Sequence, residues 1–159
     1  MSVRPSPVGL ALRPLTPDDL DAVIAIDRAH SGASRLGFYQ KRLQAALRDP
    51  KGFVYVGATL DDQLVGFAMA RLLGGEFGHE NAAAALDAIG VDPAYLGRGI
   101  GSALMAGLDE VMRSKGVREL ETQSEWTDHD QLRFFAQIGF RHAPCTVLER
   151  DAAPLNEAR

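Results

Sequence analysis

The chain has 159 residues, 46% of them hydrophobic and 24% charged, which suits one globular domain with a single core. No apolar run approaches the roughly 18 residues of a membrane span, and no signal peptide is expected at the N-terminus. The formal net charge of −4 argues against a nucleic-acid partner. The one cysteine, Cys145, excludes an internal disulfide, fits a reducing cytoplasm and is expected to be a small buried hydrophobe.

Apolar periodicity and turn residues predict one domain over residues 10–150, with loose tails at 1–9 and 151–159. Thr16 is expected to cap a first helix, with Pro17 at its first position and Asp19 closing a capping-box-like pair. The other expected elements are a strand at 10–12, a helix at 34–50, strands at 53–56 and 64–69 that flank a hairpin turn at Asp61-Asp62, a strand at 86–91, a helix at 99–115, a strand at 117–123, a helix at 128–138 capped by Asp128, and a strand at 146–148. This order predicts a mixed sheet with helices on both faces.

The segment from Ile89 to Met105 reads as a short strand, a stop, a glycine-rich turn and an amphipathic helix. Glycines at the alternate positions 97, 99 and 101 let the backbone approach a ligand with no Cβ in the way. The following helix offers unpaired N–H groups and the positive end of its dipole. Such a turn suits phosphate oxygens, although the same glycines equally suit a flexible turn.

This segment resembles the acetyl-CoA signature of the GNAT superfamily of N-acetyltransferases, Gln/Arg-x-x-Gly-x-Gly/Ala after a strand ending in Val-x-Pro. Gly99 and Gly101 fall on the two small positions and Val91 lies upstream, whereas Leu96 replaces the Gln or Arg. A second segment, residues 132–140, resembles the family's last helix and its closing Gly-Phe. The resemblance implies an α/β (α+β) fold with a mixed, mostly antiparallel sheet of six or seven strands and about four flanking helices.

The resemblance also implies an acyltransferase that moves the acetyl group of acetyl-CoA to a primary amine of a small molecule or a protein, in the cytoplasm and as a possible homodimer. Neither a nucleic acid nor a membrane is expected as partner, and the four histidines show no metal-ligand spacing. The residues expected to contact the cosubstrate lie on the strand, the turn and the last helix: Ile89, Gly90, Val91, Leu96, Gly97, Arg98, Gly99, Ile100, Gly101, Ser102, Asp128 and Phe135.

Direct attack needs a base, because less than ~0.1% of an alkylamine with a pKa of ~10.4 is neutral at pH 7. Asp87 lies two residues before Ile89, so strand alternation predicts that it shares a face with Ile89 and Val91. We therefore take Asp87 as the candidate base, with Glu121 in reserve. Three further residues are expected to contact the substrate: Gln123, Trp126 and Glu76.

Phe135 stands where the family usually has a tyrosine that protonates the departing thiolate. A thiol pKa near ~8.5 makes an unprotonated leaving group tolerable, and Tyr39 or Tyr55 is a possible substitute acid. Two alternatives stay open. One is an acyl-CoA-binding module without turnover, and the other is a dinucleotide-binding fold, which is disfavoured by the five residues between Val91 and Gly97. Acidic residues mildly favour a cationic acceptor.

Overall fold

A computed structural model describes residues 6–75 and 82–152 of the chain. Its internal contacts divide the chain into two units, Met1–Gln123 and Ser124–Arg159. The first unit holds a five-stranded sheet and three α-helices, and the second holds one α-helix and an extended C-terminal segment. None of the helices in the described part is long and apolar enough to cross a membrane.

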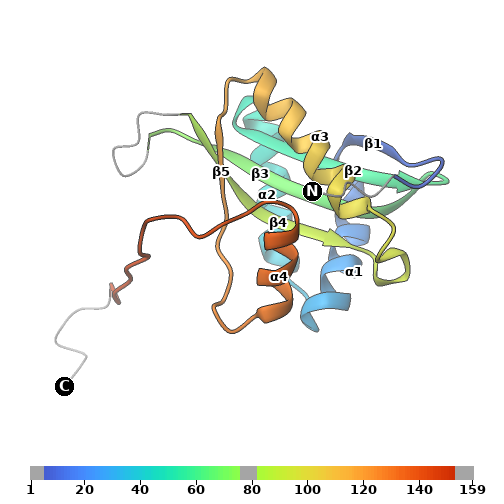
Figure 1. Ribbon diagram of the computed structural model, residues 1–159. Helices are drawn as coiled ribbons and strands as arrows, with labels where there is room; N and C mark the ends of the chain where they lie inside the picture. The colour runs from blue at the N-terminus through green and yellow to red at the C-terminus, as the bar shows by residue number, and fades with distance from the viewer. Residues whose placement is uncertain (1–5, 76–81, 153–159) are drawn as a thin grey trace. The chain divides into compact units, whose positions relative to one another are not determined.

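The sheet follows chain order and is antiparallel except for its last pair (Figure 1). Its strands are β1 (Ala11–Pro14), β2 (Phe53–Leu60), β3 (Gln63–Leu73), β4 (Ala83–Val91) and β5 (Glu119–Glu121), with β4 and β5 parallel. This is the mixed, mostly antiparallel sheet that the sequence predicts, with five strands in the described residues where six or seven were expected. A dinucleotide-binding fold is excluded because its sheet is parallel.

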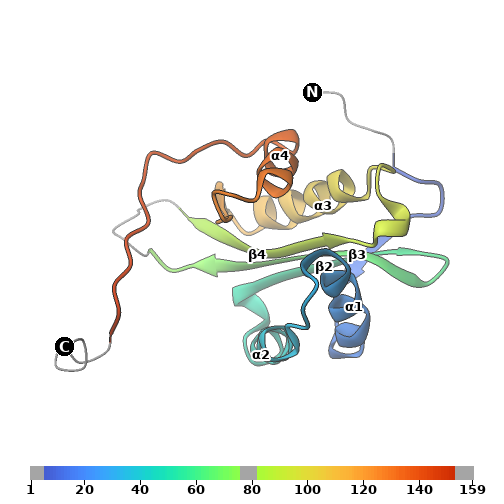
Figure 2. The ribbon, with the colours of Figure 1, turned by 90° about the horizontal axis from the view of Figure 1, so that it is seen from below.

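Helices cover both faces of the sheet, as predicted (Figure 2). One face carries α1 (Leu20–Ser31) and α2 (Leu36–Arg48), and the other carries α3 (Ile100–Ser114). Three short 3-10 turns join these elements: η1 (Pro17–Asp19), η2 (Pro50–Gly52) and η4 (Pro93–Tyr95).

The first helical segment begins at the predicted cap. The Asp19 carboxylate accepts the Thr16 N–H at 2.8 Å, and it also binds the guanidinium of Arg13. The first of these bonds satisfies a backbone donor that a helix N-terminus otherwise leaves unpaired. The helix ends at Gly32, whose φ of 72° is the left-handed conformation that glycine adopts without strain.

An apolar cluster fills the space between the sheet and the helices α1 and α2, and its burial holds those helices in place. Its members are the side chains of Val23, Ile26, Tyr39, Leu43, Tyr55, Phe67 and Met69. On the opposite face, Ile100 and Leu104 of α3 pack over Gly66 of β3, where a Cβ atom would lie 3.1 Å from each side chain. Residues of β3 therefore alternate between the two faces from Gly66 onward.

A β-bulge in β4 changes which residues share a face. Ala70 pairs with Leu86, and Met69 pairs with Ala88, so Asp87 is the extra residue without a partner on β3. Ala88 packs on the core below α1 and α2. Asp87 contacts the α2 side as well, so these two consecutive residues lie on one face.

Because of the bulge, the prediction that Asp87 shares a face with Ile89 and Val91 is wrong. Ile89 pairs with Ala68 and Val91 pairs with Gly66, which places both on the α3 face. Uninterrupted alternation would have put Asp87 beside them. One extra residue shifts the phase, and the carboxylate faces α2 instead.

The second unit contains α4 (His129–Gln137), whose predicted cap is confirmed because the Asp128 carboxylate accepts the Gln131 N–H at 3.1 Å. Two sequence expectations are wrong here. Residues 146–148 are not a strand but part of an irregular, exposed segment, and Cys145 is exposed rather than buried. Neither has a neighbouring strand or core among the described residues to pack against.

Candidate active site

The glycine-rich turn leads directly into the N-terminus of α3. Gly97 and Gly99 have φ values of 78° and 81°, a left-handed conformation that side-chain-bearing residues rarely adopt. The first intrahelical bond runs from the Ala103 N–H to the Gly99 carbonyl at 3.0 Å. The N–H groups of residues 100–102 therefore lack intrahelical acceptors, and no side chain caps them. Backbone donors and the helix dipole converge here, an arrangement that favours an anion.

Side chains around the turn add little hydrophobic cover. Leu96, which replaces the family's polar residue, is 57% exposed. The Arg98 guanidinium lies 5.2 Å from the ring centre of Tyr95, so a cation is held beside the turn. The Ile100 side chain is buried in the core, which leaves only its backbone N–H for a ligand.

Beyond its first residues, β4 has an open edge. Ala85 and Glu121 form the last β4–β5 pair, and the Thr122 hydroxyl then donates to the Leu86 carbonyl at 3.0 Å. From residue 87 onward, β4 has no neighbouring strand on this side among the described residues. The strands part just before residues 89–91, the part of β4 that the sequence predicts to contact the cosubstrate.

The hydrogen-bond pattern between β3 and β4 determines which backbone groups of β4 face this open edge. The Asp92 N–H donates to the Val65 carbonyl at 2.8 Å, so every second residue, including Gly90, directs its N–H and C=O toward β3. Ile89 and Val91 direct theirs to the open edge. Of the three predicted backbone contacts on β4, the geometry therefore offers Ile89 and Val91, whereas Gly90 is engaged in the sheet.

His30 is part of this edge and was not singled out by the sequence. Its Nε2 atom lies 2.6 Å from the Val91 carbonyl oxygen, which joins the last turn of α1 to the end of β4. The only available signal was a histidine in the last turn of a predicted helix, which also suits a cation beside the helix dipole. The Ile89 backbone and the Val91 N–H remain as donors and acceptors for a ligand.

Asp87 is held by two arginines. The Arg71 Nε atom donates to Oδ1 at 3.2 Å, and the Arg42 Nε atom lies 3.8 Å from Oδ2. The Asp87 side chain is only 11% exposed, and Oδ2 is buried without a hydrogen bond among the described residues. Because Oδ1 accepts a hydrogen bond from Arg71 and Oδ2 is buried, this carboxylate is not accessible as a base.

Glu121 is the more accessible of the two predicted carboxylates. Cross-strand pairs share a face, and Glu121 pairs with Ala85, which pairs with Arg71 on the α2 face. Glu121 is exposed, and no ion pair involves it in the part of the chain that the structure describes. It stands at the point where β4 and β5 separate.

Neither tyrosine proposed as a substitute acid is exposed. Tyr39 is fully buried, and its hydroxyl accepts from Arg35 at 3.1 Å; burial raises its pKa. The Tyr55 hydroxyl donates to the Arg42 carbonyl at 3.2 Å, and burial raises its pKa to about 12. Both phenols hold the α2 side of the core together.

Of the remaining predicted contacts, those that the structure describes lie at or after the end of the first unit in the chain. Gln123 ends the first unit and is exposed. In the second unit, Trp126 is 81% exposed, and Phe135 is 6% exposed with its ring 5.2 Å from that of Phe140. Glu76 lies outside the described residues.

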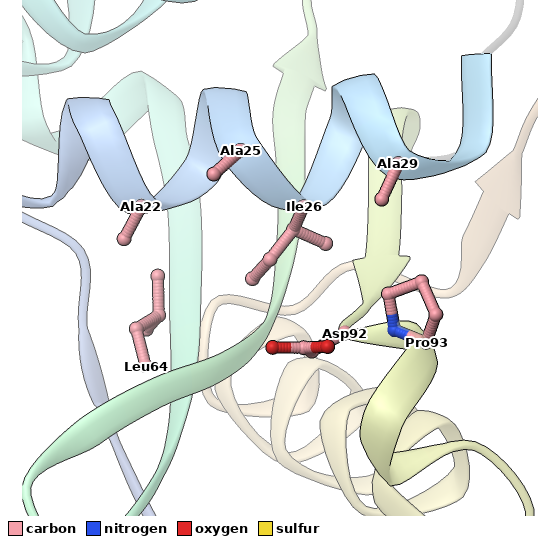
Figure 3. A pocket seen from close by; sticks show the side chains of 7 residues that line it. All are labelled: Ala22, Ala25, Ile26, Ala29, Leu64, Asp92 and Pro93. Carbon is pink, nitrogen blue, oxygen red and sulfur yellow. The ribbon is translucent and has the colours of Figure 1, made fainter. Parts of the chain in front are cut away.

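A separate hollow of about 190 Å³ lies between α1 and the chain around η4 (Figure 3). Figure 3 shows the α1 side chains on one side of it, facing Leu64 and the Asp92–Pro93 corner on the other. Its only carboxylate, Asp92, already accepts the Ala94 N–H at 3.0 Å. It contains none of the predicted site residues, and its lining carries no acid–base chemistry. The lining residues are Ala22, Ala25, Ile26, Ala29, Leu64, Asp92 and Pro93.

Among residues 6–75 and 82–152, three or more His, Cys, Asp or Glu side chains nowhere gather as metal ligands would.

The sequence model described as the acetyltransferase (GNAT) family matches residues 20–140. The chain therefore belongs to the GNAT family. An aminoglycoside N-acetyltransferase in complex with CoA aligns over 96% of this chain and all of its own with a TM-score of 0.75, and an aminoglycoside 6'-N-acetyltransferase from Acinetobacter haemolyticus aligns over 91% and 99% with a TM-score of 0.76. Their identities of 17% and 15% make this a likeness of fold.

Two curated relatives are more similar in sequence. A mycothiol acetyltransferase of Clavibacter michiganensis subsp. michiganensis is 30% identical over 155 residues, which are 94% of this chain and 48% of that protein. The N-alpha-acetyltransferase RimI of Mycobacterium tuberculosis is 41% identical over 90 residues, covering 55% of this chain and 51% of that protein. The chain thus spans about half the length of the curated relatives it matches.

Proposed function

We propose that this chain is an N-acetyltransferase that transfers the acetyl group of acetyl-CoA to a primary amine, acting in the cytoplasm. The observation that carries the proposal is the pairing of a left-handed glycine turn at an uncapped helix N-terminus with an open strand edge nearby. Membership of the family and relatives named as acetyltransferases support it.

The residues present fit acetyl-CoA as cosubstrate. The N–H groups of residues 100–102 suit the pyrophosphate, and Arg98 adds a cation beside them. The edge groups of Ile89 and Val91 suit the amides of the pantetheine arm, because an extended chain can pair with a strand edge as another strand does. An N–H on this edge also suits the thioester oxygen, where negative charge develops during attack.

In the proposed reaction the amine nitrogen attacks the thioester carbonyl, a C–N bond forms, and the C–S bond breaks to release CoA. The ammonium form of the acceptor first loses one proton to become the nucleophile, and the nitrogen loses a second proton to solvent after attack; the departing thiolate gains one proton from solvent, so one proton is released overall. We assign the first transfer to Glu121, directly or through one water, because it is exposed where the strands part. Asp87 is a positioning residue, since Arg71 and Arg42 hold its carboxylate.

A catalytically silent acyl-CoA-binding module is the second candidate. It is favoured by Phe135 in place of the usual acid and by the buried tyrosines. It predicts the same affinity for CoA without transfer to any amine.

The decisive experiment measures binding and turnover in the same preparation. Acetyl-CoA at ~100 times its dissociation constant should stabilise the fold by about 2.7 kcal/mol, whereas NADH should have no effect. CoA release is then followed with a panel of primary amines. Stabilisation with turnover supports the transferase, stabilisation without turnover supports the silent module, and no stabilisation by either CoA species contradicts both.

A further inference from the structure

Two arginines converge on one aspartate on the α2 side of the sheet. Arg42 comes from α2 and Arg71 from β3, and both meet Asp87 of β4 through their Nε atoms, at 3.8 and 3.2 Å. We call Arg42 and Arg71 the arginine pair. Within residues 6–75 and 82–152, neither arginine donates a hydrogen bond from its Nη atoms. Their side chains are 32% and 38% exposed, so these donors are accessible to a ligand.

The charges at this position do not balance. Among the described residues, Asp87 is the one carboxylate that forms an ion pair with either arginine, so within this cluster two guanidinium groups share a single negative charge. The adjacent Arg35 does not change this sum, because Asp27 neutralises it through a 2.8 Å bond to Nε. The Phe38 ring lies between these cations, with the guanidinium carbons of Arg35 and Arg42 each 5.4 Å from its centre.

A guanidinium presents five N–H donors in a planar fork, which matches a carboxylate in two parallel bonds. Here Asp87 engages only the Nε side of each member of the arginine pair. Asp87 thus anchors both side chains and leaves the unpaired fork of each for an external anion.

We propose that the acceptor carries a carboxylate as well as its amine, and that the arginine pair binds this carboxylate; the proposal rests on the acetyltransferase function proposed above. Asp87 lies two positions before Ile89 on β4, so the arginine pair and the strand edge proposed for acetyl-CoA belong to neighbouring parts of one strand. Glu121 lies on the same face and suits an ammonium group. This combination selects zwitterionic acceptors of the amino-acid or short-peptide class, in contrast to the purely cationic acceptor that the acidic residues suggested.

The test compares acceptors that differ only in the carboxylate. β-Alanine is paired with β-alaninamide, and glycylglycine with glycylglycinamide, in an assay of CoA release with acetyl-CoA. We expect kcat/KM to be about 10- to 100-fold higher for the acid of each pair, the effect of hydrogen bonds to a charged group. O-Phosphoethanolamine against ethanolamine tests whether the arginine pair prefers a phosphate.

Variants assign the effect to the arginine pair. Arg42→Gln should remove the preference for the acid, so that kcat/KM falls more for the acid than for the amide, while Arg71 still binds Asp87. Arg48→Gln is the matched control, since Arg48 is an exposed arginine of the same helix. If Arg42→Gln does not fold, Arg42→Lys keeps the charge and loses the fork, and it should reduce the preference in part.

The outcomes separate this proposal from the acetyltransferase function. Equal turnover of acid and amide, or a preference confined to the phosphate, overturns the carboxylate site and leaves the transferase intact. If CoA binds but no amine is acetylated, glutarate replaces the acceptor in a thermal unfolding assay. Stabilisation by glutarate that Arg42→Gln abolishes then supports the site without any turnover, and equal behaviour of wild type and Arg42→Gln overturns it.

Discussion

Arg71 on β3 donates to Asp87 on β4 across 3.2 Å, and this bond exists because a bulge turns Asp87 toward the α2 face. Without the bulge, the carboxylate would face α3 beside Ile89. We therefore expect the two carboxylates to have different roles in the reaction. Asp87 is engaged and covered, whereas Glu121 is exposed at the point where β4 and β5 part.

Glu121→Gln is expected to lower kcat by about 10² to 10⁴, the usual contribution of a positioned base, because an amide cannot accept the amine proton. The measurement is kcat against pH with a saturating amine. The variant should also lose the part of the pH dependence that the base contributes. Glu119→Gln is the control, because Glu119 is exposed on the same strand but pairs with Ala83 where the strands are still joined. An unchanged kcat in Glu121→Gln removes Glu121 from the mechanism.

Asp87→Asn is expected to act on substrate binding rather than on proton transfer. Losing the carboxylate releases both arginines, so KM for a carboxylate-bearing acceptor should rise while the shape of the pH profile is retained. Steady-state kinetics at several pH values separate the two effects. A large fall in kcat with an altered pH profile and an unchanged KM contradicts the positioning role.

Gly99→Glu is expected to weaken acetyl-CoA binding by about tenfold or more, because it adds bulk and negative charge where the pyrophosphate is placed. The same substitution at Gly116 is a matched control. Gly116 also has a positive φ, 75° against 81°, but it follows the other end of α3 and has open space around it. Both variants bear the backbone strain, and only Gly99→Glu should lose affinity in a calorimetric titration. Equal affinity of folded Gly99→Glu and Gly116→Glu for acetyl-CoA would contradict the assignment of the pyrophosphate to the glycine turn.

Gly90→Ala is expected to destabilise the fold by about 1–3 kcal/mol through overpacking. A Cβ atom there would lie 2.9 Å from Cε1 of Phe67 and 3.1 Å from Cγ2 of Ile26. Gly37→Ala in α2 is the control, since nothing lies within 4 Å of its Cβ and the change should stabilise by about 0.4–1 kcal/mol. Urea unfolding measures both. A neutral Gly90→Ala with impaired CoA binding would instead favour a direct role for Gly90 in the site.

Turn and capping residues, together with the apolar periodicity, predicted the parts of the fold that depend on residues close in sequence. The α1 start at Thr16–Asp19, the hairpin at Asp61–Asp62 and the Asp128 cap each depend on residues adjacent in the chain. The bulge could not be found this way, because alternation carries no signal for one unpaired residue. The expected strand at 146–148 is wrong for a related reason: pairing needs a partner edge, which a short apolar run does not specify.

In the candidate site, too, the features that are local in sequence were predictable, and the contacts between distant segments were not. The glycine turn and the helix it precedes are continuous in sequence, so their geometry was accessible from spacing alone. The arginine pair and the His30 contact join α1, α2, β3 and β4 over long sequence separations, and no motif marks them. In the sequence, Arg42 and Arg71 resemble ordinary exposed cations. Only the structure shows that both contact Asp87.

Acid is expected to destabilise the fold through Asp19 and Asp27. Hydrogen bonds from Arg13 lower the pKa of Asp19. For Asp27, burial is the largest single influence and acts upward, but the bonds and charge of Arg35, together with Tyr39 and His30, outweigh it and the pKa is lowered. A carboxyl whose pKa is lower when folded stabilises the protein above its unfolded pKa of about 3.9, and this stabilisation is lost as the pH falls through the folded value.

The free energy of unfolding should therefore be level from pH 7 to about 5 and fall below about 4. Asp27→Asn should lose about 1–2 kcal/mol at pH 7, a figure discounted because Arg35 is 47% exposed, and its acid limb should be shallower. Asp21→Asn, on the exposed side of the same helix, should follow the wild-type curve. Parallel curves for Asp27→Asn and wild type would show that the Asp27–Arg35 pair does not carry the acid sensitivity.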